Sequence, residues 1–254
     1  MEIELLLVCF GLFVMSILYS SVGHGGASGY LAILSLSLYG SMESSWLKQY
    51  AWCLNLVVAA IAFYHYYLEG YFNKKLTFPF IIGSIPFAII GGFLRIDGVI
   101  YDSLLSITLI WAAYKLYQTK KDLEIKSSIP NLKISISTGA GIGFFSGVIG
   151  VGGGIFLSPI ILLKKWANPK TVAATSALFI WVNSIAGLFG TGISNQLNIE
   201  LKILLPFVIS VLIGGFLGSK FGSKSNENIV KLLLIFVLVV ASMKRIFEII
   251  INLI

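Results

Sequence analysis

The sequence is poor in charged residues. Asp, Glu, Lys and Arg make up only 11% of the 254 residues, whereas about 25% is usual in a soluble domain. Apolar residues account for 57%, and so few charged side chains cannot cover the surface of a water-soluble globule of this composition. The composition therefore excludes an ordinary soluble enzyme and a disordered chain, and it predicts a protein that is solvated by lipid.

Cysteine is also scarce, and the common catalytic motifs are absent. Cys9 and Cys53 lie in apolar runs, which predicts small buried side chains rather than a disulfide or a metal site. No segment fits the GxxxxGK[ST] or HExxH patterns, so ATP use, a metal and a cofactor are not expected. The net charge of +7 comes from short basic clusters between apolar runs, which is typical of membrane-protein loops and not of a nucleic-acid interface.

Apolar runs dominate the sequence instead. They occupy residues 3–21, 30–39, 46–68, 76–94, 99–117, 134–149, 155–163, 172–189, 201–217 and 229–251. A helix needs about 20 residues to cross a bilayer core, so the short second run of each series of five predicts a half-helix. The polar stretch at 118–133 divides the chain into a first membrane repeat (1–117), a cytoplasmic linker and a second membrane repeat (134–254).

Landmarks of the first half recur in the second half in the same order. The pairs are GHGGA at 23–27 with GVGGG at 150–154, Asn55 with Asn183, Pro79-Phe80 with Pro206-Phe207, and IGGFL at 90–94 with IGGFL at 213–217. Such a series predicts an internal duplication, which is the usual architecture of secondary transporters.

The basic residues predict the orientation. If the N-terminus is outside and every run crosses, the lysines at 74–75, 120–133, 164–170 and 220–224 are inside, as the positive-inside rule requires. Lys48 and Arg95 are then counted outside, with most of the acidic residues. Five crossings per half would make the repeats inverted, whereas eight full spans would allow parallel repeats. We therefore expect an all-α polytopic protein of the inner membrane with two repeats of about five helical segments, inverted with respect to each other.

Two glycine clusters, at 23–26 and 150–154, interrupt the apolar runs. Consecutive glycines break a helix, and inside a membrane a break is tolerated only where it is buried in protein or lines a wet cavity. The helix that follows presents unpaired N–H groups and partial positive charge. Two such N-termini near the midplane predict a site for a small oxyanion.

Glycines spaced by four residues have a different interpretation. Gly139, Gly143 and Gly147 form one such series, and Gly214, Gly218 and Gly222 form another. This spacing favours close packing between helices and not ligand binding.

Polar residues near the breaks complete the candidate site. No Asp or Glu falls near the middle of a predicted span, which favours an anion over a cation. His24 is suited either to carrying a proton with the anion or to donating a hydrogen bond to it, and each asparagine is suited either to lining the path or to joining two helices. The expected substrate-binding residues are Ser20, Ser21, Gly23, His24, Gly25, Gly26, Ser28, Asn55, Gly150, Gly152, Gly153, Gly154 and Asn183.

Taken over essentially the whole chain, these features resemble the TauE/SafE family of sulfite exporters and toluene-sulfonate uptake permeases. The most specific part is the second glycine cluster with Pro159 shortly after it, and the first cluster is a degenerate twin. The resemblance implies transport of small sulfur-containing or carboxylate anions, such as sulfite, sulfoacetate and other organosulfonates. The first half departs from the second, with His24 and Ala27 in place of Val151 and Gly154, so the resemblance does not name the anion.

Three functions follow from these observations. The leading one is a secondary transporter that moves a small anion by alternating access around the paired breaks. A passive anion channel could use the same dipoles. An intramembrane enzyme is the weakest reading, because Ser20 or Ser21 with His24 would lack an orienting carboxylate. The expected partners are the anion and the lipid bilayer, and a homo-oligomer is left open.

Overall fold

A computed structural model describes residues 2–96, 98–118, 129–223, 243 and 246, and every structural statement below concerns these residues. They form the helices α1 (Glu2–Ser20), α2 (Ala27–Leu36), η1 (Leu38–Ser41, a 3-10 helix), α3 (Ser44–Leu68), α4 (Lys74–Phe93), α5 (Gly98–Gln118), α6 (Leu132–Ile149), α7 (Gly154–Leu163), α8 (Pro169–Ile193) and α9 (Leu201–Gly222). Six of these, α1, α3, α4, α6, α8 and α9, are long and apolar enough to cross a membrane. The expected all-α multi-pass fold is confirmed. The apolar run at 229–251 lies outside the described residues, apart from 243 and 246.

The starts of α4 and α8 are set by polar caps rather than by the first apolar residue. The side chain of Asn73 accepts a hydrogen bond from the Leu76 N–H at 3.2 Å, so α4 begins two residues before its apolar run. The side chain of Asn168 accepts from the Thr171 N–H at 2.8 Å and is followed by Pro169 in the first turn of α8. Such caps satisfy N–H groups that have no partner within the helix.

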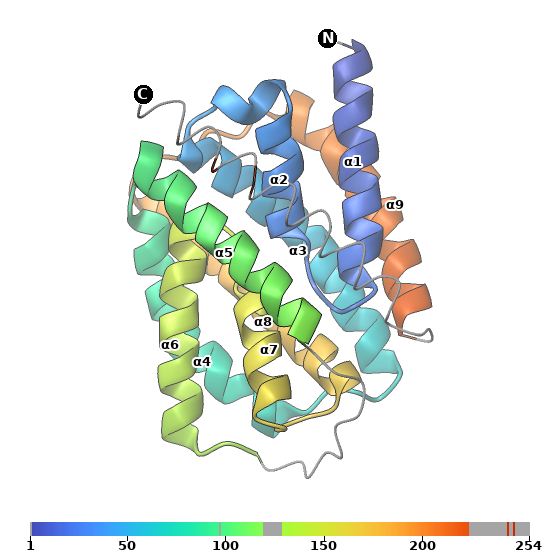
Figure 1. The fold of residues 1–254 in the computed structure, drawn as a ribbon, viewed down its shortest axis with the longest axis vertical. Helices are drawn as coiled ribbons and strands as arrows, with labels where there is room; N and C mark the ends of the chain where they lie inside the picture. The colour runs from blue at the N-terminus through green and yellow to red at the C-terminus, as the bar shows by residue number, and fades with distance from the viewer. Residues whose placement is uncertain (1, 97, 119–128, 224–242, 244–245, 247–254) are drawn as a thin grey trace.

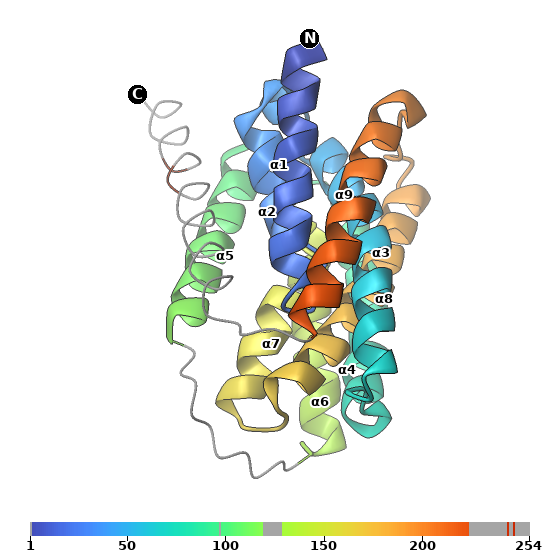
Figure 2. The ribbon, with the colours of Figure 1, turned by 90° about the vertical axis from the view of Figure 1, so that its right-hand side faces the viewer.

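The two helix pairs that contain the breaks run in opposite directions (Figures 1 and 2). The N-terminus of α1 lies at the upper end of the molecule, and α2 turns back toward that end. In contrast, α6 starts at the lower end, and α7 turns back toward the lower end. Inverted repeats would produce this arrangement, and the repeat relation itself stays a prediction.

The first helix of each half packs against the fourth helix of the other half. Helix α1 lies along α9, α6 lies along α4, and α3 and α8 contact each other between these pairs. A methyl group added at Gly218 of α9 would collide with the backbone of Ile17, and one added at Gly139 of α6 would collide with that of Phe80. The glycines spaced by four therefore serve close helix packing, as their spacing predicts.

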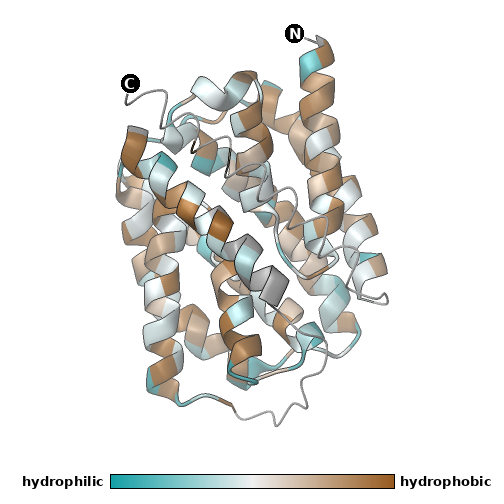
Figure 3. Cartoon of the chain, in the orientation of Figure 1, coloured by the Kyte–Doolittle hydropathy of each residue, from teal (hydrophilic) through white to brown (hydrophobic). Residues whose placement is uncertain are grey.

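Hydrophobic residues (brown) cover much of the length of the helices, and hydrophilic residues (teal) mark loops at both ends of the bundle (Figure 3). The lower end holds the loops at 70–73 and 164–168, and the upper end holds those at 94–96 and 195–200. The described lysines of the lower end are Lys74, Lys75, Lys133, Lys164, Lys165, Lys170 and Lys220. Glu43, Arg95, Glu200 and Lys202 belong to the upper end, so the basic excess lies at the lower end.

Candidate functional site

Each break ends at a glycine with a left-handed backbone. Gly26 precedes α2 with φ 102°, and Gly153 precedes α7 with φ 84°. A side chain in this conformation is strained, and there is no room for one. An added methyl carbon would lie 2.5 Å from the Tyr30 ring at Gly26 and 2.7 Å from the Phe179 ring at Gly153. Glycine is therefore required for the abrupt start of both short helices.

The two breaks meet at Asn55 of α3. Its Oδ1 accepts a hydrogen bond from the Ala27 N–H at 3.0 Å, at the start of α2. A methyl group added at Gly152 would lie 2.6 Å from its Nδ2, and one added at Gly25 would collide with its Oδ1. The Asn55 Nδ2 also donates to Ser184 Oγ on α8 at 3.3 Å. One buried amide thus contacts both breaks and α8.

His24 joins the breaks on another side. Its Nε2 lies 2.9 Å from Ser158 Oγ and 3.3 Å from the Gly154 carbonyl oxygen, both on α7. Ser158 Oγ lies 2.7 Å from Ser176 Oγ on α8. The Tyr19 ring of α1 meets the imidazole edge-on, with 6.4 Å between ring centroids. All of these side chains are buried.

The structure gives the remaining predicted residues separate contacts. The Ser28 hydroxyl donates to Tyr19 Oη at 2.8 Å, and the Asn183 Nδ2 donates to Ser84 Oγ on α4 at 3.0 Å. The hydroxyls of Ser20 and Ser21 donate to carbonyl groups of their own helix. The serines at 20 and 21 also face α9, where added methyl groups on Gly218 and Gly222 would collide with them. The Gly23 N–H donates to the Ser20 carbonyl at 3.0 Å, so Ser20 meets the first break through its backbone. The expected role of both serines in binding stays a prediction.

Gly23 and Gly150 occupy matching places in the two breaks. Both have positive φ angles, 74° and 92°. An added methyl group would lie 2.5 Å from Ala173 Cα at Gly23 and 2.7 Å from Lys48 Cγ at Gly150. Each glycine therefore lets its break press against a long helix of the opposite half.

The electrostatics of this region favour negative charge. The buried polar side chains among the described residues are serines, threonines, asparagines, one glutamine, one histidine and one lysine, without a carboxylate. No group of three or more His, Cys, Asp or Glu residues in the described part of the chain could hold a metal ion. The N-terminal ends of α2 and α7, each with partial positive charge, lie close together. An anion between them would lower their mutual repulsion.

Lys48, which the sequence analysis counted among the outer charges, lies near the upper end but is not exposed to solvent. Its side chain is fully buried in α3, because its hydrocarbon stem packs on Gly150. The Nζ donates to the Leu94 carbonyl at 3.2 Å and lies 6.0 Å from the centroid of the Trp52 ring.

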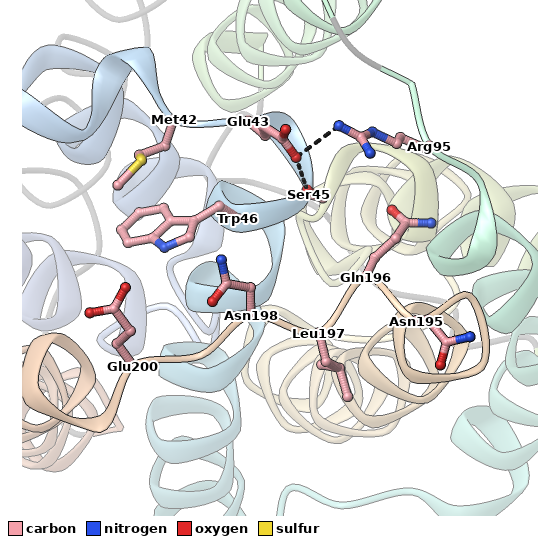
Figure 4. Close-up of a pocket in the computed structure, with 10 residues that line it drawn as sticks. All are labelled: Met42, Glu43, Ser45, Trp46, Arg95, Asn195, Gln196, Leu197, Asn198 and Glu200. Carbon is pink, nitrogen blue, oxygen red and sulfur yellow. Dashed lines mark hydrogen bonds and ion pairs between the residues drawn. The ribbon is translucent and has the colours of Figure 1, made fainter.

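A cavity of about 310 Å³ opens at the upper end (Figure 4). It is lined by Met42, Glu43, Ser45, Trp46, Arg95, Asn195, Gln196, Leu197, Asn198 and Glu200. Arg95 and Glu43 form an exposed ion pair at 2.9 Å. The buried Trp46 Nε1 and Gln196 Oε1 have no hydrogen-bond partner among the described residues. The exposed side chains of Arg95 and Glu43 give the lining of this cavity its charged groups.

Gln49 holds the upper loop in place next to this cavity. Its Nε2 donates to the Gln196 carbonyl at 2.8 Å, and its Oε1 accepts from the Asn198 N–H at 2.7 Å. Tyr50 Oη accepts from the Glu200 N–H at 2.9 Å. Gln49 is fully buried. We call these contacts the Gln49 clamp; they tie α3 to the α8–α9 loop.

Sequence reasoning missed Ser158 and Ser84. Ser158 is four residues after Gly154, so both lie on one face of α7, and this spacing was the available signal. Nothing in the sequence links Ser84 to Asn183, since that contact depends on how α4 packs on α8.

Comparisons with known proteins cover nearly the whole chain. The family described as "Sulfite exporter TauE/SafE" matches residues 7–245. A "Probable membrane transporter protein" of Sinorhizobium fredii is 34% identical over 229 residues, which are 88% of this chain and 90% of the relative.

More distant relatives carry the same description. One from Methanocaldococcus jannaschii is 30% identical over 163 residues, 62% of this chain and 61% of that protein. One from Bacillus subtilis, YdhB, is 21% identical over 243 residues, 89% of this chain and 94% of that protein. No solved structure matches the chain.

Proposed function

Because this chain belongs to the sulfite exporter TauE/SafE family, it is a membrane transporter, and we propose that it carries a small organic or sulfur-containing anion by alternating access. The anion would bind between the starts of α2 and α7, beside Asn55. The lysine-rich lower end would face the cytoplasm, in accord with the positive-inside rule, and the membrane would be the cell membrane.

The observation that carries this proposal is the meeting of two helix N-termini at one buried amide. Asn55 accepts from the start of α2 and touches Gly152 just before α7. N–H groups and partial positive charge converge there without a carboxylate among the described neighbours. Discontinuous helices at a repeat interface are a common substrate site in secondary transporters.

The upper end supports a carrier more than an open pore. The Gln49 clamp closes the α8–α9 loop onto α3, next to the cavity that contains Arg95. In the proposal the cavity is the outer vestibule, and the clamp opens when the site faces outward. A passive channel would need a continuous path, whereas the residues of both breaks are buried and closely packed.

Flux into proteoliposomes tests the function. Purified protein is assayed for uptake and counter-exchange of sulfite, sulfoacetate, taurine, sulfate and small carboxylates. We expect saturable uptake of one anion and acceleration when the same anion is present inside. Current steps of a single channel, or the absence of flux for every anion, would contradict the proposal.

Variants at two glycines locate the site. Gly153→Leu places a side chain at a left-handed position beside Phe179 and is expected to abolish flux. Gly141→Leu is the matched control, because an added methyl group on that residue of α6 has nothing within 4 Å. Full flux in a folded Gly153→Leu protein would exclude the start of α7 as the binding site.

A further inference from the structure

His24 is the one described histidine at the breaks, and its ring crosses from one break to the other. Its backbone belongs to the first break, where its N–H donates to the Tyr19 carbonyl at 2.9 Å. Its Nε2 reaches Gly154 O and Ser158 Oγ, at the start of the short helix that follows the second break. The protonation state of one ring therefore affects a contact between both halves of the proposed site.

The partners of Nε2 can satisfy it in either protonation state. When Nε2 carries no hydrogen, the Ser158 hydroxyl can donate to it and accept from Ser176. When Nε2 carries a hydrogen, it can donate to Ser158 Oγ and to the Gly154 carbonyl, which is only an acceptor, and Ser158 can donate to Ser176. The two hydroxyls thus reverse direction as the imidazole gains or loses a proton.

The surroundings make the proton and the anion depend on each other. The groups that face the imidazole are Tyr19 from α1, Ser158 from α7 and, through Ser158, Ser176 from α8. No carboxylate is buried among the described residues, and the buried cation, Lys48, donates to Leu94 O near the upper end. A lone imidazolium or a lone anion in this region would be a buried charge without a counter-ion, which is costly. Bound together, each compensates the charge of the other.

We propose that His24 takes up one proton with each anion, so that the protein is an anion–proton symporter in which Ser158 and Ser176 are positioning residues. The inference rests on the proposed function. The proton enters from the side that supplies the anion, is held on the imidazole while the site is closed, and leaves with the anion on the other side. By linkage, protonation raises the affinity for the anion, and the anion raises the affinity for the proton.

The test measures accumulation against a pH gradient. Proteoliposomes containing the full chain are clamped at zero membrane potential with valinomycin and equal potassium. The probe is the anion of the panel above that exchanges fastest at equal pH. One coupled proton predicts about tenfold accumulation for each unit by which the outside is more acidic. A pH dye inside the vesicles should report acidification as the anion enters.

The variant His24→Gln distinguishes the uptake of a proton by this side chain from its hydrogen bonding. The glutamine amide can donate to Gly154 O but cannot take up a proton. We expect slower exchange and, for a probe whose charge is the same at both pH values, an accumulation ratio that is the same with and without the gradient. A probe that itself titrates, such as sulfite, responds equally in the wild type and the variant, so the difference between the two isolates His24. Gradient-driven accumulation that survives in His24→Gln would overturn the assignment.

Ser158→Ala tests the positioning role and does so even if His24→Gln loses all exchange. The Ser158 hydroxyl is a partner of Nε2 in both protonation states, and without it the unprotonated Nε2 has no donor whereas the protonated Nε2 keeps the Gly154 carbonyl as its acceptor. The pH of half-maximal exchange should therefore rise, by about one unit. Ser16→Ala is the control, because that buried hydroxyl donates to Phe13 O of its own helix; its pH profile should equal that of the wild type. An unchanged profile in Ser158→Ala would overturn the role of Ser158.

The outcomes for the two hypotheses differ. If no anion exchanges at equal pH, the proposed function fails and the coupling fails with it. If an anion exchanges but neither accumulates with the gradient nor acidifies the vesicles, only the coupling fails.

Discussion

The two helix breaks share a backbone shape but differ in their side chains. Both end at a left-handed glycine, and both are followed by a helix of 10 residues. The first break carries His24 where the second carries Val151. The backbone that starts a short helix is thus common to both breaks, while the titratable group belongs to one. A binding site formed by both breaks would have backbone N–H groups from each of them, but a side chain that can take up a proton only from the first.

The two asparagines of the landmark alignment also differ. Asn55 accepts from the start of the short helix of its own half, whereas Asn183 donates to Ser84 on α4 and to the carbonyl of Phe179. The Oδ1 of Asn183 is buried and has no partner among the described residues. The first break is therefore held by an amide, and the second is not. Each prediction below tests one part of this comparison.

The largest effect is expected at the two capping glycines. Gly26→Ala and Gly153→Ala each force a left-handed alanine, which costs roughly 1–2 kcal/mol, and each adds a methyl group against an aromatic ring. We expect uptake to fall by about tenfold or more in both. Gly70→Ala is the control, since it has φ 78° but nothing within 4 Å of the added carbon. If only one capping glycine were sensitive, the two breaks would not be equivalent in backbone.

Replacing the two asparagines with alanine should reduce transport to different extents. Asn55→Ala leaves the buried Ala27 N–H without its acceptor, a loss of roughly 1–3 kcal/mol. Asn183→Ala removes two donated bonds but also an unpaired oxygen. Initial uptake per folded protein should fall about fivefold further in Asn55→Ala than in Asn183→Ala. Equal losses would mean that both amides hold their breaks in the working cycle.

Substitutions of glycines on the faces of the long helices should affect stability more than transport. Gly143→Ala of α6 would drive a methyl group into the backbone of Ser84, and overpacking of this kind costs roughly 1–3 kcal/mol. We expect a melting temperature lower by about 2–12 °C. Gly141→Ala, on the open side of the same helix, should raise it by about 2–4 °C through helix propensity. A fall in melting temperature at Gly141 would contradict the packing assigned to this face.

The smallest effect is expected at Ser28, which matches Ile155 of the second break. Its hydroxyl donates a hydrogen bond to Tyr19 Oη. Ser28→Ala loses about 1 kcal/mol, so the change in uptake should stay within about fivefold. A loss as large as that of Gly26→Ala would place Ser28 in direct contact with the anion.

Much of the fold follows from the apolar runs, because a membrane span needs a long uncharged helix. The positions of α1, α3, α4, α6, α8 and α9 were predictable in this way. Their ends were not, since Asn73 and Asn168 extend two helices past the apolar residues by capping them. Hydropathy does not register a single hydrogen bond at a helix end.

The candidate site was predictable in its backbone and only partly in its side chains. The consecutive glycines predicted both breaks, and the alignment of the first half with the second identified Asn55. The burial of Lys48 and the contact of His24 with Ser158 depend on how distant helices pack. Hydropathy treats Lys48 as a surface charge, although its stem can lie along Gly150.

The crossed packing of the two halves has a consequence for synthesis. Helix α1 leaves the ribosome before α9, the helix that covers its Ser16 and Ser20 face and that begins about 180 residues later. Translation proceeds at about 5–20 residues per second, so roughly ten to forty seconds pass before α9 is made. Until then, the face of α1 that packs against the glycines of α9, with its serine hydroxyls, has no helix covering it. During that time the insertion machinery or lipid must occupy the place of α9. A ribosome that stalls before Leu201 therefore leaves behind a helix whose partner has not yet been made.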